Sequence, residues 1–249
     1  MKSKSRYCLL DSIRGFSVLS MVLYHAMYDI VAIYGANVSW YFDTPGYIWQ
    51  QSICWCFIFI SGVCWQLGKS PLKHGFVVSL CGLVITAATF IFMPSQRIIM
   101  GVLSFLGLAA LLMIPVSKVT KNSNPSILMI ISAAAFFATR NVNNGWLGFE
   151  SVRIAPVPQW FYNIPGGFIL GFPKPQFYSS DYFSLIPWFF LFAAGYYFWK
   201  AASEKLKKSK AIYFDVPVLG AVGRKSLIIY MLHQPVTMAV LELVSKMWR

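Results

Sequence analysis

The chain has 249 residues, of which 57% are hydrophobic and only 12% are charged, and it contains nine Trp and 21 Phe. Charged residues make up about 25% of an ordinary soluble domain, so the composition excludes that class and predicts a membrane protein. The formal net charge is +13, but basic loops beside anionic lipid account for it, and we expect no nucleic-acid partner.

Apolar runs long enough to cross a hydrocarbon core of about 30 Å, which takes about 20 helical residues, recur along the chain. We predict about seven spans, at Phe16–Tyr34, Tyr47–Leu67, Gly75–Phe92, Ile98–Val116, Ser126–Ala138, Tyr182–Lys200 and Ser226–Met247. A further apolar patch, Trp160–Phe172, contains Pro165 and three Gly residues, so a re-entrant or interfacial segment suits it better than a span. The expected fold class is all-α: a polytopic transmembrane helical bundle formed by one domain, residues 1–249.

The basic residues predict the orientation of these spans, because Lys and Arg collect near cytoplasmic span ends. An N-terminus in the cytoplasm puts 14 basic residues on that side and six on the other. With seven spans, the C-terminus and a loop at about 139–181 then lie outside. The loop mixes aromatic, Pro, Gly and Asn residues, which is typical of packed rather than disordered chain. Its aromatic rings suit either a sugar-binding surface or a belt at the membrane surface.

The first apolar segment carries ionisable residues on one helical face. Arg14 and His25 lie about three turns apart and within about 20° of each other, and Asp29 follows His25 by one turn. Each such group costs roughly 2.5–3.5 kcal/mol in a membrane helix, so the pattern indicates function more than simple helix association. We expect His25 to act as a general base or to become acylated itself, with Asp29 fixing its tautomer. A functional role for Arg14 and snorkelling to the cytoplasmic interface stay equally open.

The last span carries a second polar stripe on one helical face, formed by Ser226, Tyr230, His233 and Thr237. His233 lies about 10 Å of helix rise from the inner edge, shallower than His25. The two histidines could line a path from the cytosol to the middle of the membrane. An interhelical hydrogen bond is an equally good interpretation of His233.

Five motifs in order carry a resemblance over nearly the whole chain. They are the opening set of Arg6, Asp11, Arg14-Gly15, Met21, His25 and Asp29, then FIFISGVCW (Phe57–Trp65), IMGVLSFLGLAALL (Ile99–Leu112), SSDYFSLIPWFFLFAAGYYFWK (Ser179–Lys200) and GRKSLIIYMLHQPV (Gly223–Val236). Together they resemble the heparan-α-glucosaminide N-acetyltransferase catalytic-domain family. Arg14 and His25 also match the Arg, ten residues, His arrangement of a wider group of membrane acyltransferases. One departure is Ser104, where many relatives carry a His.

The resemblance implies a membrane acyltransferase that moves an acetyl or other acyl group from cytosolic acyl-CoA to an amino or hydroxyl group of an extracytoplasmic glycan or glycolipid. It implies acetyl-CoA as the donor substrate, in a pocket rimmed by Arg14, Arg224 and Lys225, because CoA carries several phosphates. The acceptor would come from outside, near Asp181 and Tyr182. We expect a multi-pass protein of the bacterial plasma membrane, and a homo-oligomer stays open.

Two other classes of protein remain open. A proton-coupled small-solute transporter would also use intramembrane His and Asp residues, although the chain shows no internal duplication of the kind found in many carriers. A non-catalytic partner in an assembly would use the polar stripes for helix association. The Cys and His residues show no metal-ligand spacing, so we expect no metal.

Overall fold

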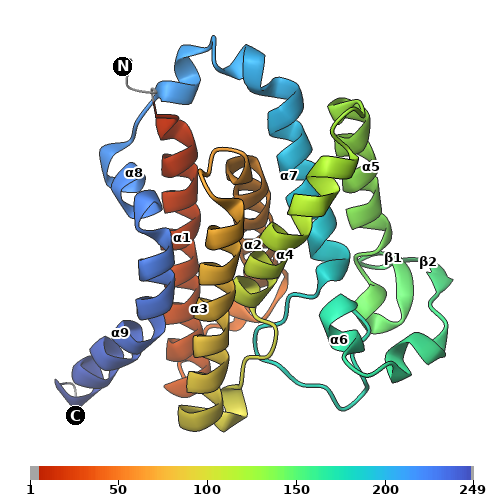
Figure 1. Cartoon of the computed structure of the whole chain (residues 1–249). Helices are drawn as coiled ribbons and strands as arrows, with labels where there is room; N and C mark the ends of the chain where they lie inside the picture. The colour runs from red at the N-terminus through yellow and green to blue at the C-terminus, as the bar shows by residue number, and fades with distance from the viewer. Residues whose placement is uncertain (1–5, 248–249) are drawn as a thin grey trace. The chain divides into compact units, whose positions relative to one another are not determined.

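The structure is a computed structural model and describes residues 6–247 (Figure 1). The chain forms two compact units. The first, called the terminal unit below, comprises Met1–Ile60 with Glu204–Arg249, and the second, the central unit, comprises Ser61–Ser203. The helices α2 (Thr44–Trp65) and α7 (Leu185–Leu206) carry the chain from one unit into the other. A single functional domain stays a prediction.

The terminal unit is built around the first helix. Its other elements, besides most of α2, come from the two ends of the chain: α1 (Cys8–Tyr28), η1 (Asp29–Ile33), η2 (Ser39–Tyr41), η6 (Lys210–Tyr213), α8 (Pro217–Arg224) and α9 (Ser226–Met247). Helix α1 contacts both α8 and α9, and Figure 1 shows α8 and α9 beside it. The two polar stripes predicted from the sequence therefore belong to neighbouring helices.

Helices α1 and α8 cross so closely that their backbones touch. A Cβ atom on Gly15 would lie 1.9 Å from the carbonyl oxygen of Leu219, and one on Gly223 would lie 1.9 Å from the carbonyl oxygen of Asp11. Small residues permit this approach because they leave no side chain between the two backbones. The Gly of the Arg14-Gly15 motif thus has a packing role.

Helix α1 begins at Cys8, eight residues before the predicted start of the first span. The prediction was wrong there because Asp11 and Ser12 lower the hydropathy, whereas the structure buries both residues with partners. Asp11 forms an ion pair with Arg6. The Ser12 hydroxyl accepts a hydrogen bond of 3.2 Å from the backbone N–H of Val216, just before α8. These contacts satisfy the polar groups of Asp11 and Ser12, so the first turns of α1 can be buried although they are not apolar.

The central unit contains the remaining helices and one small sheet. Its elements, besides most of α7, are α3 (Pro71–Phe92), η3 (Pro94–Gln96), α4 (Val102–Val119), α5 (Pro125–Ala138), η4 (Val142–Asn144), β1 (Trp146–Phe149), β2 (Val152–Pro156), η5 (Gln159–Asn163) and α6 (Gly167–Leu170). Helices α3 and α4 pack through glycines. A Cβ on Gly107 would lie 2.3 Å from the Ser79 hydroxyl, and one on Gly82 would lie 2.5 Å from the Ser104 hydroxyl.

The loop between α5 and α7 is packed, as its aromatic content predicts. Strands β1 and β2 form an antiparallel hairpin, an element that the all-α prediction omits. A buried cluster under the loop consists of Val142, Val157, Tyr162 and Phe172. The patch Trp160–Phe172 forms only η5 and α6, and both are too short to cross a membrane.

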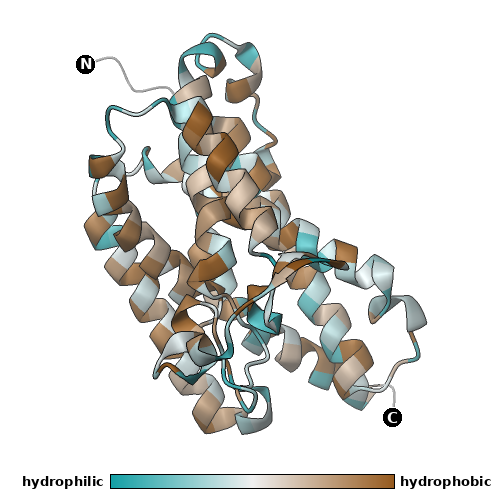
Figure 2. Ribbon diagram, turned by 90° about the vertical axis from the view of Figure 1, so that its right-hand side faces the viewer, coloured by the Kyte–Doolittle hydropathy of each residue, from teal (hydrophilic) through white to brown (hydrophobic). Residues whose placement is uncertain are grey.

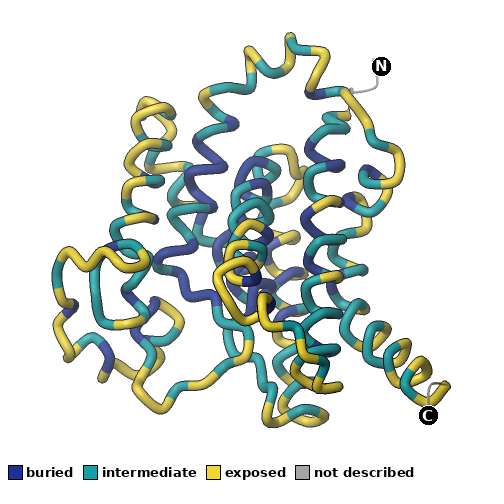
Figure 3. Tube along the Cα trace, turned by 180° about the vertical axis from the view of Figure 1, so that it is seen from behind, coloured by how far each residue is buried: buried dark blue, intermediate teal, exposed yellow. Residues whose placement is uncertain are grey.

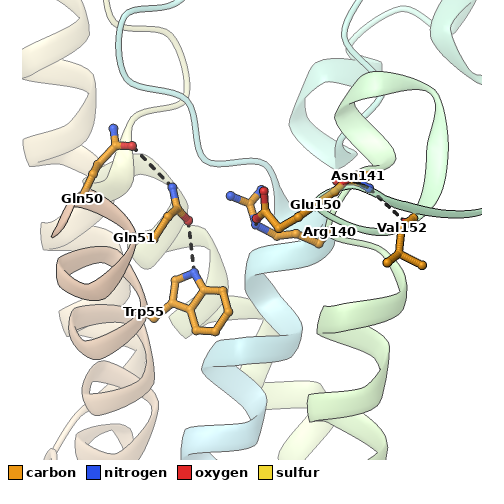
Figure 4. A network of polar contacts seen from close by, with 7 residues as sticks. All are labelled: Gln50, Gln51, Trp55, Arg140, Asn141, Glu150 and Val152. Atoms are coloured by element: carbon orange, nitrogen blue, oxygen red, sulfur yellow. Dashed lines mark hydrogen bonds and ion pairs between the residues drawn. The ribbon is translucent and has the colours of Figure 1, made fainter. Parts of the chain in front are cut away.

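Polar contacts hold the hairpin to the end of α5 (Figure 4). The Asn141 side-chain amide donates to the carbonyl oxygen of Glu150 at 2.8 Å. Arg140 pairs with the Glu150 carboxylate at 3.8 Å and lies over the Trp188 ring, 4.9 Å from its centroid. The hairpin is thereby fixed to both α5 and α7 within the central unit.

Within residues 6–247, six helical segments are long and apolar enough to cross a membrane: Cys8–Ile33, Thr44–Trp65, Pro71–Phe92, Val102–Val119, Pro125–Asn144 and Ser226–Met247. Hydrophobic residues cover much of the long helices in Figure 2, and most of α9 has the exposed and intermediate colours of Figure 3. Exposed apolar helix surfaces of this kind are expected in a protein surrounded by lipid. The predicted span Tyr182–Lys200 corresponds to α7, whose Trp, Tyr and Lys residues lower its hydropathy. The count of seven spans stays a prediction.

Candidate active site

The two intramembrane histidines meet where α1 and α9 pack together. The rings of His25 on α1 and His233 on α9 lie 5.0 Å apart between centroids, with their planes tilted by 49°. The sequence places each residue on a polar stripe but cannot pair the stripes, since they are about 200 positions apart. Their contact gives the terminal unit two imidazoles at one place.

The hydrogen bond of His233 defines which ring nitrogen is available for chemistry. Its Nδ1 lies 2.6 Å from the carbonyl oxygen of Tyr230. A carbonyl oxygen only accepts, so Nδ1 carries the proton and donates it. In the neutral imidazole, Nε2 then holds the lone pair, which is the arrangement that a general base requires.

The Asp29 carboxylate belongs to the same cluster but has a different partner from the one expected. It is fully buried and accepts hydrogen bonds of 2.9 and 3.0 Å from the Nε2 amide nitrogen of Gln234 on α9. Asp29 opens η1, a π-helical turn, and such turns occur frequently at functional sites. In the structure, Asp29 thus links α1 to α9 through Gln234, and orienting His25 stays a hypothesis.

The three cations expected on the donor side belong to the α1–α8 crossing. Arg14 precedes Gly15 in α1, Arg224 follows Gly223 at the end of α8, and Lys225 is the next residue. Within residues 6–247, no carboxylate lies within ion-pair distance of these three side chains. Their positive charges are therefore available for an anionic ligand.

Asp181 and Tyr182 support the structure of the central unit. The Asp181 carboxylate accepts a hydrogen bond of 3.1 Å from the backbone N–H of Val102, the first residue of α4. Burial raises the Asp181 carboxyl pKa from 3.8 to about 6, and the Val102 hydrogen bond opposes this rise. The Tyr182 hydroxyl donates to the carbonyl oxygen of Phe168, and its ring packs on Phe177 at 4.9 Å between centroids.

A cavity of about 340 Å³ lies in the segment between α5 and α7, beside these Tyr182 contacts. Its lining includes Phe168, Phe172, Phe177, Lys174 and Gln176. Phe168 and Phe177 stack with centroids 5.2 Å apart, and both touch Tyr182. Aromatic faces combined with amide and ammonium donors are suited to a sugar ring. Tyr182 thus contacts two of the aromatic residues that line the cavity.

The Ser104 hydroxyl lies at the α3–α4 contact beside Gly82, so this position serves helix packing here. Among residues 6–247, no group of three or more His, Cys, Asp or Glu side chains is arranged to hold a metal ion. The absence of a metal cofactor remains a sequence-based expectation.

These features define a class: a multi-pass helical membrane protein with a His, Asp and Gln cluster inside its apolar helices. Residues 6–235 match the family described as heparan-alpha-glucosaminide N-acetyltransferase, catalytic, and the chain belongs to this family. The resemblance drawn from the five motifs is thus confirmed, and the family indicates membrane acetyltransferase activity. Searches of the curated proteins and of the solved structures found no match.

Proposed function

We propose that this protein transfers an acetyl group from cytosolic acetyl-CoA to an amino or hydroxyl group of a glycan or glycolipid on the other side of the membrane. The observation that carries the proposal is the contact between His25 and His233 in a chain of this acetyltransferase family. A pair of imidazoles in an apolar setting can accept and return a proton without a change of position.

The proposed chemistry needs one base and one thioester. The acceptor nitrogen or oxygen attacks the carbonyl carbon of the thioester, and a histidine takes the proton from the attacking atom. The bond from carbon to sulfur then breaks, and the CoA thiolate leaves and receives that proton. In the two-step alternative, His25 attacks first and holds the acetyl group until the acceptor takes it. Both routes produce the acetylated acceptor and free CoA.

The donor would bind through its phosphates. Arg14, Arg224 and Lys225 supply three positive charges near the α1–α8 crossing, and guanidinium groups bind phosphate with paired hydrogen bonds. On the central unit, we propose that the loop cavity binds the sugar of the acceptor through Phe168 and Phe177. Replacing Phe177 by Ala should therefore weaken sugar binding and leave acetyl-CoA binding unchanged.

A proton-coupled transporter would also use the His and Asp cluster. None of the contacts among residues 6–247 favours transport over acyl transfer, whereas the family match favours acyl transfer. The two functions differ in one measurable respect, because a transporter moves a solute without cleaving acetyl-CoA.

The test is acetyl transfer by the purified protein in detergent. Protein is mixed with acetyl-CoA labelled in its acetyl group and with a series of simple sugars that carry amino or hydroxyl groups, and labelled sugar is detected by chromatography. We expect labelled product with at least one sugar and equimolar release of thiol. Acetyl-CoA that stays intact with every sugar would contradict the proposal. If the protein reconstituted in liposomes then takes up a solute without cleaving acetyl-CoA, the result would support the transporter.

A further inference from the structure

The β1–β2 hairpin begins where a candidate membrane span ends. The helical segment Pro125–Asn144 has 20 residues, which give about 30 Å of rise, the thickness of the hydrocarbon core with no length to spare. Strand β1 begins two residues later, at Trp146. Two residues reach at most about 7 Å, and the polar layer on each side of the core is about 5–7 Å thick. The hairpin therefore begins within this interfacial layer or at its rim.

Contacts with the end of α5 hold the rest of the hairpin at the same depth. Glu150 lies at the turn between the two strands. Its carbonyl oxygen accepts a hydrogen bond of 2.8 Å from the Asn141 side-chain amide, and its carboxylate lies 3.8 Å from Arg140 (Figure 4). The turn thus returns to the helix end from which β1 departs. The hairpin lies across the end of α5 and does not project away from it.

Strand β2 presents apolar side chains on the surface of the central unit. The exposed fractions are 61% for Val152 and 69% for Ile154. The residues on either side of Ile154 pair with consecutive residues of β1, so Ile154 is the extra residue of a β-bulge. Bulges redirect a side chain at the edge of a sheet. Exposed apolar groups held in this way indicate a contact with a further apolar medium or partner.

The apolar surface of α5 shows which medium that is. Helix α5 exposes Ile127, Ile130 and Ile131, which lie three and four residues apart and so share one face of the helix. Phe137 follows Ile130 by seven residues, belongs to the same face and is also exposed. Its ring packs against that of Phe149 in β1, with the centroids 5.2 Å apart. The helix surface expected to face lipid therefore continues onto the hairpin.

We propose that the β1–β2 hairpin is a membrane-surface anchor, in which Val152 and Ile154 insert into the interfacial layer of phospholipid beside α5. Insertion removes both apolar side chains from water. The backbone of β2 stays at headgroup depth, where water can still hydrogen-bond to it. Leu147 of β1 packs against the buried cluster that contains Phe172, and Phe172 lines the cavity between α5 and α7. The anchor thus keeps that cavity at the membrane surface, whether or not the protein transfers acetyl groups.

The test places a fluorescent probe on the hairpin in a lipid bilayer. In a background without the native cysteines, Ile154→Cys is labelled with the environment-sensitive fluorophore NBD and reconstituted into phosphatidylcholine nanodiscs. One sample contains phosphatidylcholine with a nitroxide near the top of its acyl chain, which quenches from the lipid. Another contains iodide, which quenches from water. We expect a blue-shifted emission that the nitroxide lipid quenches and that iodide leaves unchanged.

Asn122→Cys, labelled in the same way, is the control. Asn122 is an exposed polar residue between α4 and α5 in the same unit, and we expect iodide to quench its probe more strongly than the nitroxide lipid does. An Ile154→Cys probe that behaves like the control would overturn the proposal. So would a probe that neither quencher reaches, or complete conversion of unlabelled Ile154→Cys to a disulfide-linked dimer, because protein would then cover the hairpin.

Val152→Cys decides the matter if labelled Ile154→Cys does not fold, as judged by its elution volume in size-exclusion chromatography. Its side chain is also well exposed, and the proposal places it in the same interfacial layer. We expect the same blue shift and the same quenching by the nitroxide lipid. Quenching of this probe by iodide alone would overturn the proposal.

Discussion

The two histidines of the candidate site differ in how the protein holds them. His233 is anchored by Tyr230 through Nδ1, whereas no residue in the range 6–247 hydrogen-bonds to the ring of His25. An anchored imidazole suits proton transfer at one fixed nitrogen, and an unanchored one can turn toward a substrate or accept an acetyl group. The pair thus offers two roles that a single histidine would have to combine.

His25→Ala should abolish most acetyl transfer while the protein stays folded. The loss of a general base or nucleophile of this kind costs about 10²- to 10⁴-fold in rate. Thiol release with a sugar acceptor is the measurement, and the elution volume in size-exclusion chromatography reports the fold. His74→Ala removes the third histidine of the chain and serves as the control. A His25→Ala protein with full transfer would contradict the assignment.

Asp181 predicts a pH dependence of stability. Its carboxyl pKa is raised by burial from 3.8 to about 6, so the folded state favours the protonated form. The stabilising contribution of this proton is complete below pH 3.8 and is lost as the pH rises toward 6. Asp181→Asn stays neutral and keeps an oxygen for Val102. The melting temperature of Asp181→Asn should therefore fall less than that of the wild type between pH 3.8 and pH 6. Parallel curves of melting temperature against pH for the two proteins would contradict the prediction.

Single residues could be predicted from the sequence only where they break a pattern. His25, Asp29 and His233 stand out because ionisable groups are rare in apolar segments. Gln234 does not stand out, since a neutral amide beside a histidine is unremarkable until the structure places it against Asp29. The role of Asp181 was also hidden, because its contact with α4 joins residues nearly 80 positions apart.

At the scale of elements, the close α1–α8 crossing is the feature that positions the proposed donor-side cations. The long apolar helices could be predicted from hydropathy alone, and the last one was placed at its observed bounds, Ser226–Met247. Helix α8 could not be predicted from hydropathy, because it has only eight residues. Its burial depends on glycines that contact another helix. The β1–β2 hairpin was missed for a similar reason, since its strands have four and five residues.

Gly223→Ala should destabilise the protein by forcing these helices apart. Its new Cβ would fall 1.9 Å from the Asp11 carbonyl oxygen, and overpacking of this kind costs about 1–3 kcal/mol. The melting temperature should fall by about 2–4 °C per kcal/mol for a chain of this size. Gly68→Ala is the control, because its Cβ would meet only Trp65 at an ordinary 3.5 Å. Equal melting temperatures for the two variants would argue against the tight crossing.

At the scale of the whole molecule, the number of spans depends on whether α7 crosses the membrane. Single cysteines at Asn163 and Lys208, both exposed positions that bracket α7, decide it in a background without the native cysteines. If α7 spans, a membrane-impermeant maleimide should label Asn163→Cys in intact cells and Lys208→Cys only after permeabilisation. Labelling of both from the same side would contradict the seven-span topology and the predicted outside loop.

We propose that the terminal unit carries out acyl-CoA chemistry through His25, with charge support from Arg14. The most direct measurement is acetyl-CoA binding and slow thioester hydrolysis by the purified protein, compared with His25→Ala and Arg14→Ala. We predict saturable binding that Arg14→Ala weakens, and hydrolysis that His25→Ala abolishes. If neither acetyl-CoA nor a longer acyl-CoA binds to the wild-type protein, the claim is contradicted.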